Sequence, residues 1–149
     1  MPPKRPVTIV IADDDGDDRL LIIEAFKEFR LTNPIVEVAD GEELLDYLHS
    51  RGKFAGKNEP SLPGLILLDL NMPRMDGREA LKEIKNHPDL RRIPVVVLTT
   101  SKAEEDIIRS YDIGANSFIV KPVNVERFIE VVRSLQRYWL EIVEMPREP

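Results

Sequence analysis

The sequence predicts a doubly wound α/β domain, in which a five-stranded parallel sheet carries helices on both faces. Two observations lead to this prediction. Short apolar runs alternate with amphipathic helical segments five times along the chain, and no internal repeat interrupts the series. Each helical crossover returns the chain to the same edge of a sheet, so consecutive strands run parallel.

Residues 7–30 predict the first strand and helix. VTIVIA (7–12) is a β-branched apolar run bounded by a proline and by aspartates, as expected of a fully buried strand. Asp15 suits the N-cap of the next helix, and Asp17 and Asp18 suit the positive end of its dipole. The apolar positions of that helix recur at helical spacing: Ile22, Ala25, Phe26 and Phe29.

Four more strand–helix units follow along the chain. Alternation predicts a strand at 34–40, and apolar runs predict strands at 65–70, 93–100 and 117–122. Helices are expected at 41–51, 77–87, 103–115 and 124–143. Their core-facing residues are Leu44, Leu45 and Leu48, then Ala80, Leu81 and Ile84, then Ile107, Ile108 and Tyr111, and finally Phe128, Ile129, Val132 and Leu135.

Composition excludes several classes of function. The chain has 149 residues, 42% of them hydrophobic, which is enough for the core of one domain. A net charge of −6 argues against nucleic-acid binding, which needs a basic face. Without cysteine the chain forms no disulfide or thiolate site. His49 and His87 lie far apart in the sequence, which argues against a histidine metal site.

Targeting signals are not evident in the sequence. No apolar run approaches the ~20 residues that span a bilayer. The amino-terminal segment MPPKRPV lacks the apolar stretch of a signal peptide. We therefore expect a cytoplasmic protein with no membrane partner.

Polar residues gather where the predicted strands end. Asp13 and Asp14 follow the first strand, and Asp69 ends the third. Thr99 ends the fourth strand, and Lys121 ends the fifth. The carboxyl ends of parallel strands share one edge, where open α/β sheets bind their ligands. These side chains are therefore expected to converge on one site.

This set of residues suits phosphoryl chemistry at a metal ion. Clustered carboxylates repel one another, and an oxygen-only ligand set indicates Mg²⁺, with Mn²⁺ as an alternative. Lys121 and the Thr99 hydroxyl suit phosphoryl oxygens, and Asp69 remains as a group that could accept the phosphoryl. Each feature alone has a simpler interpretation, as a helix cap, a turn or a solvated lysine. Their common edge favours the combined site.

The motifs together resemble the receiver domain of two-component response regulators. The matching segments are the acidic pair at 13–14, LLDLNMPRMDG at 67–77, PVVVLTT at 94–100 and KP at 121–122. The resemblance covers about 7–137 and implies the flavodoxin-like strand order 2-1-3-4-5. We accordingly expect residues 1–149 to form a single receiver domain with a C-terminal extension at 138–149.

The resemblance implies a role for each residue of the site. Asp69 is the phosphoacceptor and receives its phosphoryl group from a histidine kinase. Asp14, Asp69 and the Asn71 carbonyl ligate Mg²⁺, and Asp13 acts through water. Thr99 is the switch hydroxyl, and Lys121 pairs with the phosphoryl group.

Two more features of the switch region are implied by the same resemblance. The Lys121–Pro122 peptide is expected to be cis. Phe118 occupies the position of the switch aromatic, where many members of the family carry tyrosine. Ring rotation remains available to Phe118, but the contact of a tyrosyl hydroxyl is lost.

The long connection at 49–64 and the C-terminal tail at 138–149 indicate a narrower group within the family. Both look like the single-domain regulators that partner bacterial phytochrome kinases. Basic side chains of the connection (Arg51, Lys53 and Lys57) are interpreted as solvated surface. The tail carries more apolar surface than the end of a helix needs, through Tyr138, Trp139, Leu140, Ile142, Val143 and Met145. These residues either pack on their own domain or belong to a homodimer that forms through the last helix or through the face beside the fifth strand.

Two other functions compete with a signalling phosphoacceptor that is not a turnover enzyme. A metal-dependent phosphatase of similar topology would also use an aspartyl phosphate. That class needs a second acid two residues after the nucleophile, where this chain has Asn71. A purely structural domain would not need the complete set of polar site residues, which is Asp13, Asp14, Asp69, Thr99 and Lys121.

Overall fold

The computed structural model describes residues 8–28, 33–56, 62–70, 72, 75, 77–99, 117–120 and 125–137. At residues 99, 117–120, 125, 128, 135 and 136 the description extends to the backbone only. The predicted helix at 103–115 and the predicted extension at 138–149 lie outside these residues.

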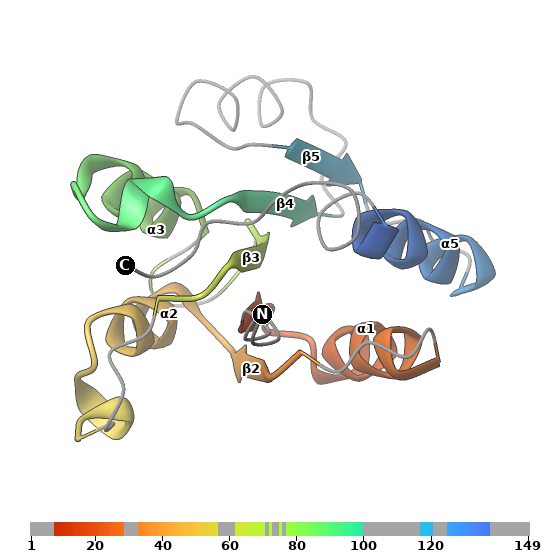
Figure 1. The fold of residues 1–149 in the computed structure, drawn as a ribbon, viewed down its shortest axis with the longest axis horizontal. Helices are drawn as coiled ribbons and strands as arrows, with labels where there is room; N and C mark the ends of the chain where they lie inside the picture. Colours follow the sequence, from red (N-terminus) through yellow and green to blue (C-terminus); the bar gives the residue numbers. More distant parts are fainter. Residues whose placement is uncertain are drawn as a thin grey trace, which may run out of the picture.

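Five strands form one parallel sheet in the order β2-β1-β3-β4-β5, as predicted (Figure 1). The strands are β1 (Ile9–Ala12), β2 (Ile35–Val38), β3 (Leu65–Asp69), β4 (Val95–Thr99) and β5 (Ser117–Val120). The α-helices of the described residues are α1 (Gly16–Glu28), α2 (Gly41–Leu48), α3 (Gly77–Asn86) and α5 (Val125–Gln136). Two 3₁₀ turns, η1 (Gly52–Phe54) and η2 (Leu90–Arg92), follow α2 and α3.

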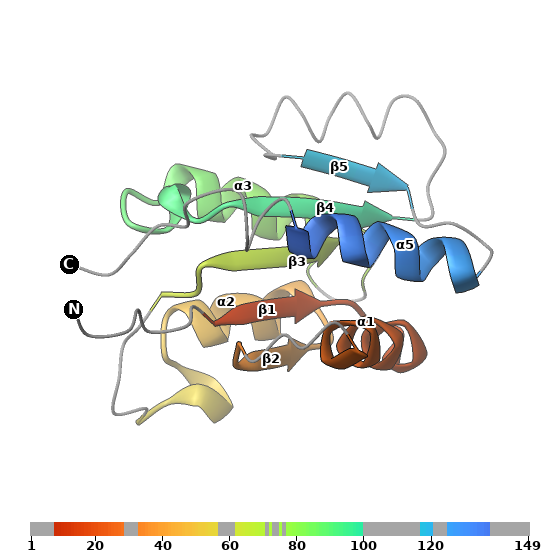
Figure 2. The ribbon, with the colours of Figure 1, turned by 45° about the vertical axis from the view of Figure 1, so that its right-hand side comes forward.

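Helices cover both faces of the sheet, which confirms the doubly wound architecture. Figures 1 and 2 show α1 and α5 on one face and α2 and α3 on the other. Side chains of β1 alternate between the two faces: Ile9 and Ile11 pack in the core beside α1, and Val10 and Ala12 pack in the core beside α2. All four are buried, as expected for a parallel sheet covered on both sides.

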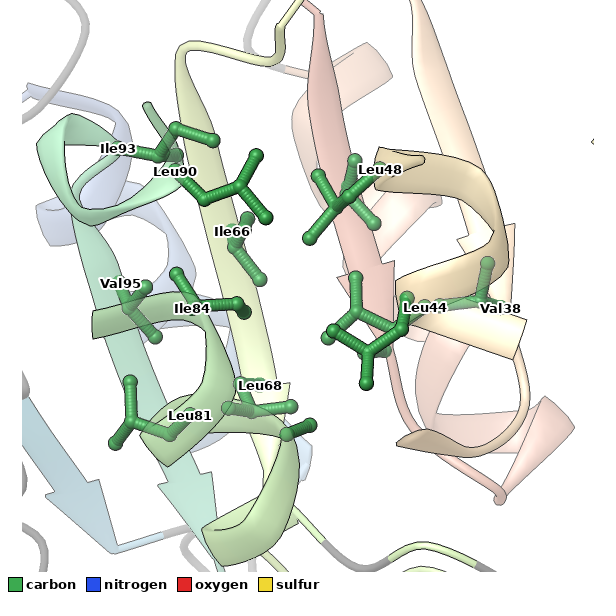
Figure 3. Packing of buried hydrophobic residues seen from close by; sticks show 14 of the residues in the cluster. Val38, Leu44, Leu48, Ile66, Leu68, Leu81, Ile84, Leu90, Ile93 and Val95 are labelled. Carbon is green, nitrogen blue, oxygen red and sulfur yellow. The ribbon is translucent and has the colours of Figure 1, made fainter. Parts of the chain in front are cut away.

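The predicted core-facing residues of the described helices are buried where their side chains are described, except Ile129, which is partly buried and packs against the core. Figure 3 shows Leu44 and Leu48 of α2 and Leu81 and Ile84 of α3 over the sheet, where Ile66 and Leu68 project from β3. On the other face the core includes Ile22, Ala25, Phe26 and Val132. A fully buried side chain of this size stabilises the fold by about 1.5–3 kcal/mol. Phe29 lies outside the described residues.

Helix α2 ends earlier than the sequence predicted. It stops at Leu48 rather than continuing to residue 51. Ser50 and Gly52 adopt φ angles of 53° and 62°, which no α-helix contains. The short turn η1 follows, and Phe54 packs edge-on against Tyr47 with ring centroids 5.2 Å apart. The left-handed residues therefore fold the start of the long connection back onto α2.

The basic side chains Arg51 and Lys53 of this connection are exposed, as predicted, and each also pairs with a carboxylate. Arg51 Nε donates to Asp46 Oδ1 at 2.9 Å, and Lys53 Nζ lies 2.8 Å from Glu43 Oε1. Both acidic partners belong to α2. Such exposed pairs stabilise by at most about 1 kcal/mol each. They nevertheless attach the start of the connection to the helix. Lys57 lies outside the described residues.

Gly77 allows α3 to begin directly against the end of β3. Its N–H donates to the Leu70 carbonyl at 3.0 Å. A Cβ at this position would stand 2.3 Å from the Asp69 carbonyl oxygen and 2.7 Å from the Leu70 Cα. Both neighbours are main-chain atoms, so no side-chain rotation would relieve the clash. The close approach of α3 to β3 therefore requires glycine here.

We expect Gly77→Ala to lower the free energy of unfolding by about 1–3 kcal/mol, as overpacking against main chain does. Urea denaturation measures the loss. Gly16→Ala is the matched control, because a Cβ there would meet only Arg19 Nη2 at 3.5 Å. Equal stability of Gly77→Ala and the unsubstituted protein would contradict this account of the β3–α3 junction.

Candidate functional site

Three carboxylates meet at the carboxyl edge of the sheet. β1 and β3 are neighbours, with Ala12 paired to Leu68, so the next residues along each strand are Asp13 and Asp69. One carboxylate oxygen from each of Asp13, Asp14 and Asp69 lies within 4.8 Å of the others. Asp13 and Asp69 are buried, at 2% and 6% exposure, and Asp14 is exposed. The predicted convergence of these three residues is confirmed.

Hydrogen bonds hold Asp13 in place from several sides. Its N–H donates to the Val38 carbonyl of β2 at 3.1 Å. Its carboxylate Oδ1 accepts the N–H of Asp15 at 2.9 Å. Its carbonyl accepts a hydrogen bond from Arg19 Nη1. The strand end that carries the acidic pair is thus fixed to β2 and to the first turns of α1.

The remaining aspartates of the cluster lie at the start of helix α1, as predicted. Asp15 Oδ1 accepts the N–H groups of Asp17 at 2.9 Å and Asp18 at 3.3 Å, which is an N-cap arrangement. Asp17 and Asp18 lie in the first turn of α1, at the positive end of its dipole. The five neighbouring aspartates therefore divide into a pocket pair and a capping group.

The segment after Asp69 is tied to the start of α2. Asp40 caps this helix, with its Oδ1 accepting the Glu43 N–H at 2.7 Å. The N–H of Gly41 donates to the Met75 carbonyl at 2.9 Å. Two helix starts, α2 and α3, thus contact the same short segment that leaves the pocket.

The other predicted site residues are placed less fully. Thr99 is the last residue of β4, and its neighbour Leu98 pairs with Asp69, so the Thr99 backbone lies at the same edge as the acidic pocket. Phe118 lies in β5 and pairs with Val97. Both are described through their backbone only. Predictions for Asn71, Lys121 and Pro122, including the cis peptide, concern residues outside the described part of the chain.

The two histidines lie together, contrary to the expectation that they are far apart. His49 caps the end of α2, His87 follows α3, and their ring centroids are 5.5 Å apart. Sequence separation was misleading because α2 and α3 pack side by side. Burial, followed by the charge of Arg51, lowers the pKa of His49.

Hydrogen bonding at His87 nevertheless argues against a histidine metal site. Nδ1 of His87 accepts the N–H groups of Asp89 at 3.1 Å and Leu90 at 3.3 Å. An accepting Nδ1 puts the ring proton on Nε2, so neither nitrogen of that tautomer offers a lone pair to a cation. The tautomer of His87, and not the sequence separation of the two histidines, is the observation that argues against such a site.

Sequence reasoning missed two residues that shape the pocket. Arg19 contacts the Asp13 carbonyl, and Gly77 contacts the Asp69 main chain. Gly77 belongs to the quoted MDG segment, so a signal for it was available. An arginine early in a helix carries no comparable signal, because most such side chains point into solvent.

Oxygen ligands of this kind fit a hard divalent cation. Two buried carboxylates and an exposed one, within 4.8 Å, supply the donor atoms that Mg²⁺ and Mn²⁺ prefer. Mg²⁺ is usually held by one or two carboxylates together with water and phosphate oxygens. The pocket is therefore suited to a cation that also contacts a phosphoryl group.

Comparison with known proteins identifies the family. Residues 9–133 match the family described as the response regulator receiver domain. The chain belongs to this family. The receiver domain is a signalling phosphoacceptor of two-component systems, so the expected function class and the flavodoxin-like fold are both confirmed.

Individual relatives of this receiver domain cover nearly its whole length. Response regulator Rcp1 of Synechocystis sp. is 41% identical over 141 residues, which are 95% of this chain and 94% of Rcp1. The crystal structure of the phosphorylated cyanobacterial phytochrome response regulator RcpA has a TM-score of 0.89 at 41% identity, and the match covers 96% of this chain and all of RcpA. The Mn²⁺-bound form of Rcp1 has a TM-score of 0.89 at 39% identity, with coverage of 95% and 100%.

Across the described ranges, no helix has the length and apolar character needed to cross a bilayer.

We expect Asp14→Asn to raise the free energy of unfolding by about 1 kcal/mol in metal-free buffer of low ionic strength, because it removes like-charge repulsion within 4.8 Å. Urea denaturation measures the gain, which should shrink as salt is added. Asp17→Asn is the matched control, because it removes an equal charge from the helix start and should lower stability by about 0.3–1 kcal/mol. The same sign for both variants would contradict the assignment of separate roles.

Proposed function

We propose that this receiver domain accepts a phosphoryl group from a histidine kinase on Asp69, in a Mg²⁺-dependent reaction, and that phosphorylation switches its interaction surface. The observation that carries the proposal is the cluster of Asp13, Asp14 and Asp69 at one sheet edge. Asp69 is the member that ends the central strand β3, buried between β1 and β4.

In this proposal the acidic residues have different roles in phosphotransfer. An Asp69 carboxylate oxygen attacks phosphorus, and the bond from phosphorus to the kinase histidine nitrogen breaks. Asp14, Asp69 and the Asn71 carbonyl hold Mg²⁺, with Asp13 acting through water. The cation offsets the negative charge of the acidic cluster and of the phosphoryl oxygens. Mn²⁺ fits the same donors, and the Mn²⁺-bound structure of Rcp1 supports this choice.

The remaining site residues are proposed to respond to phosphorylation of Asp69. Thr99 ends β4 at the same edge as the pocket, and its hydroxyl is proposed to hydrogen-bond the phosphoryl group. Lys121 is proposed to pair with that group, next to a cis peptide to Pro122. Phosphorylation adds roughly two negative charges, which attract the threonine hydroxyl. Phe118 responds by ring rotation alone, because it has no hydroxyl.

A bacterial phytochrome is the histidine kinase that we propose as the partner. RcpA is described as a cyanobacterial phytochrome response regulator, and it matches this chain over 96% of its length. The long connection after α2 is consistent with that group. We further propose a cytoplasmic protein in which residues 1–149 form a single receiver domain, with residues 138–149 as its extension.

The phosphotransfer proposal predicts one phosphoryl adduct on incubation with Mg²⁺ and acetyl phosphate, read by intact mass. Asp69→Asn and an added chelator should each abolish the adduct, because they remove the acceptor oxygen and the cation. Asp17→Asn, which removes an acid of the capping group, should keep it.

Other results of the same assay would contradict the proposed function. Repeated turnover of unrelated phosphomonoesters would favour the phosphatase that the Asn71 position argues against. If neither acetyl phosphate nor a phytochrome kinase gives an adduct, the phosphotransfer proposal is overturned.

We also propose that the chain forms a homodimer through its apolar C-terminal tail. Size-exclusion chromatography with light scattering should give the mass of two copies, and Trp139→Ser with Leu140→Ser should give one. Leu20→Ser is the control, because Leu20 is an exposed apolar residue of α1, outside the tail. A monomer for the unsubstituted chain, both with and without phosphorylation, would instead mean that the tail packs on its own domain.

A further inference from the structure

Arg19 links the acidic pocket to the edge strand of the sheet. It lies in α1, and its side chain is 20% exposed. Nη1 donates to the main-chain carbonyl of Asp13, and Nε donates to Glu37 Oε1 at 3.1 Å. One guanidinium thus joins α1, the end of β1 and strand β2.

The contacts of Arg19 complete the fixation of Asp13. The N–H of Asp13 is held by the Val38 carbonyl, and its carboxylate is held by the N–H of Asp15. Arg19 holds the remaining main-chain group, the carbonyl that leads into Asp14. The guanidinium therefore holds the peptide that joins the two pocket acids, at the point where the chain enters Asp14.

If only its charge mattered, Arg19 would weaken the binding of a cation in this pocket. A guanidinium beside three carboxylates competes with a divalent cation for the same negative potential. Glu37 reduces that competition, because its carboxylate pairs with Nε of the same guanidinium at 3.1 Å. Geometry and charge thus predict opposite effects of removing Arg19, which makes its role testable.

We propose that Arg19 is a positioning residue for the metal site, holding the Asp13–Asp14 peptide in the orientation that binds the cation, with Glu37 anchoring the guanidinium. This inference rests on the proposed metal-dependent function. Groups outside the ligand set that orient the ligands commonly change metal affinity by about 10–100-fold when removed.

Isothermal titration of the full chain with Mn²⁺ tests the role without any phosphotransfer. Arg19→Gln should weaken Mn²⁺ binding by about tenfold. Arg19→Lys should fall between the two proteins, because an ammonium keeps the charge but lacks the fork that reaches two acceptors. Arg51→Gln is the matched control: it removes the same charge from another arginine–carboxylate pair, at 56% exposure, and should leave affinity unchanged.

The outcomes separate this inference from the proposed function. Unchanged or tighter Mn²⁺ binding in Arg19→Gln, with circular dichroism showing a folded chain, would overturn the positioning role, since charge alone predicts that result. If Arg19→Gln does not fold, Arg19→Lys decides, and affinity equal to that of the unsubstituted chain would overturn the role. Absence of Mn²⁺ binding in both the unsubstituted chain and Arg51→Gln would overturn the metal-dependent function itself.

Discussion

Mutual repulsion among the carboxylates of Asp13, Asp14 and Asp69 is the constraint on which the rest of this structure depends. Two of these groups are buried, where charge is poorly solvated. The fold tolerates them because the sheet fixes their positions through buried hydrocarbon on both faces. Main-chain donors, the start of α1 and the Arg19 guanidinium surround the same point. Stability supplied elsewhere in the core thus keeps these like charges close together.

The sheet and its pocket were predictable because they follow from periodicity and strand direction. Apolar runs such as 65–70 specify buried parallel strands, and parallel strands place Asp13 and Asp69 side by side. The division of the aspartates between pocket and cap was predictable from their positions relative to the first helix. These inferences need only local patterns and the handedness of crossovers.

Other features depended on tertiary contacts that no local pattern encodes. The pairing of His49 with His87 requires two helices to pack together, and the long separation of these residues along the chain indicated the opposite. The early end of α2 depends on left-handed backbone at Ser50, a residue type that rarely adopts it. Arg19 was missed because its role comes from a carbonyl and a carboxylate on two other elements.

The hydrogen bond from the Asp13 N–H to the Val38 carbonyl has a thermodynamic consequence for the edge of the sheet. β2 is an edge strand, hydrogen-bonded on one side only, and such strands are among the first elements to open in local unfolding. Opening of β2 would release both Asp13 and the Glu37 anchor of Arg19. A ligand that requires the docked strand stabilises it by mass action. Occupancy of the pocket and hydrogen-exchange protection of β2 are therefore coupled, so cation concentration sets how often this edge of the domain is open.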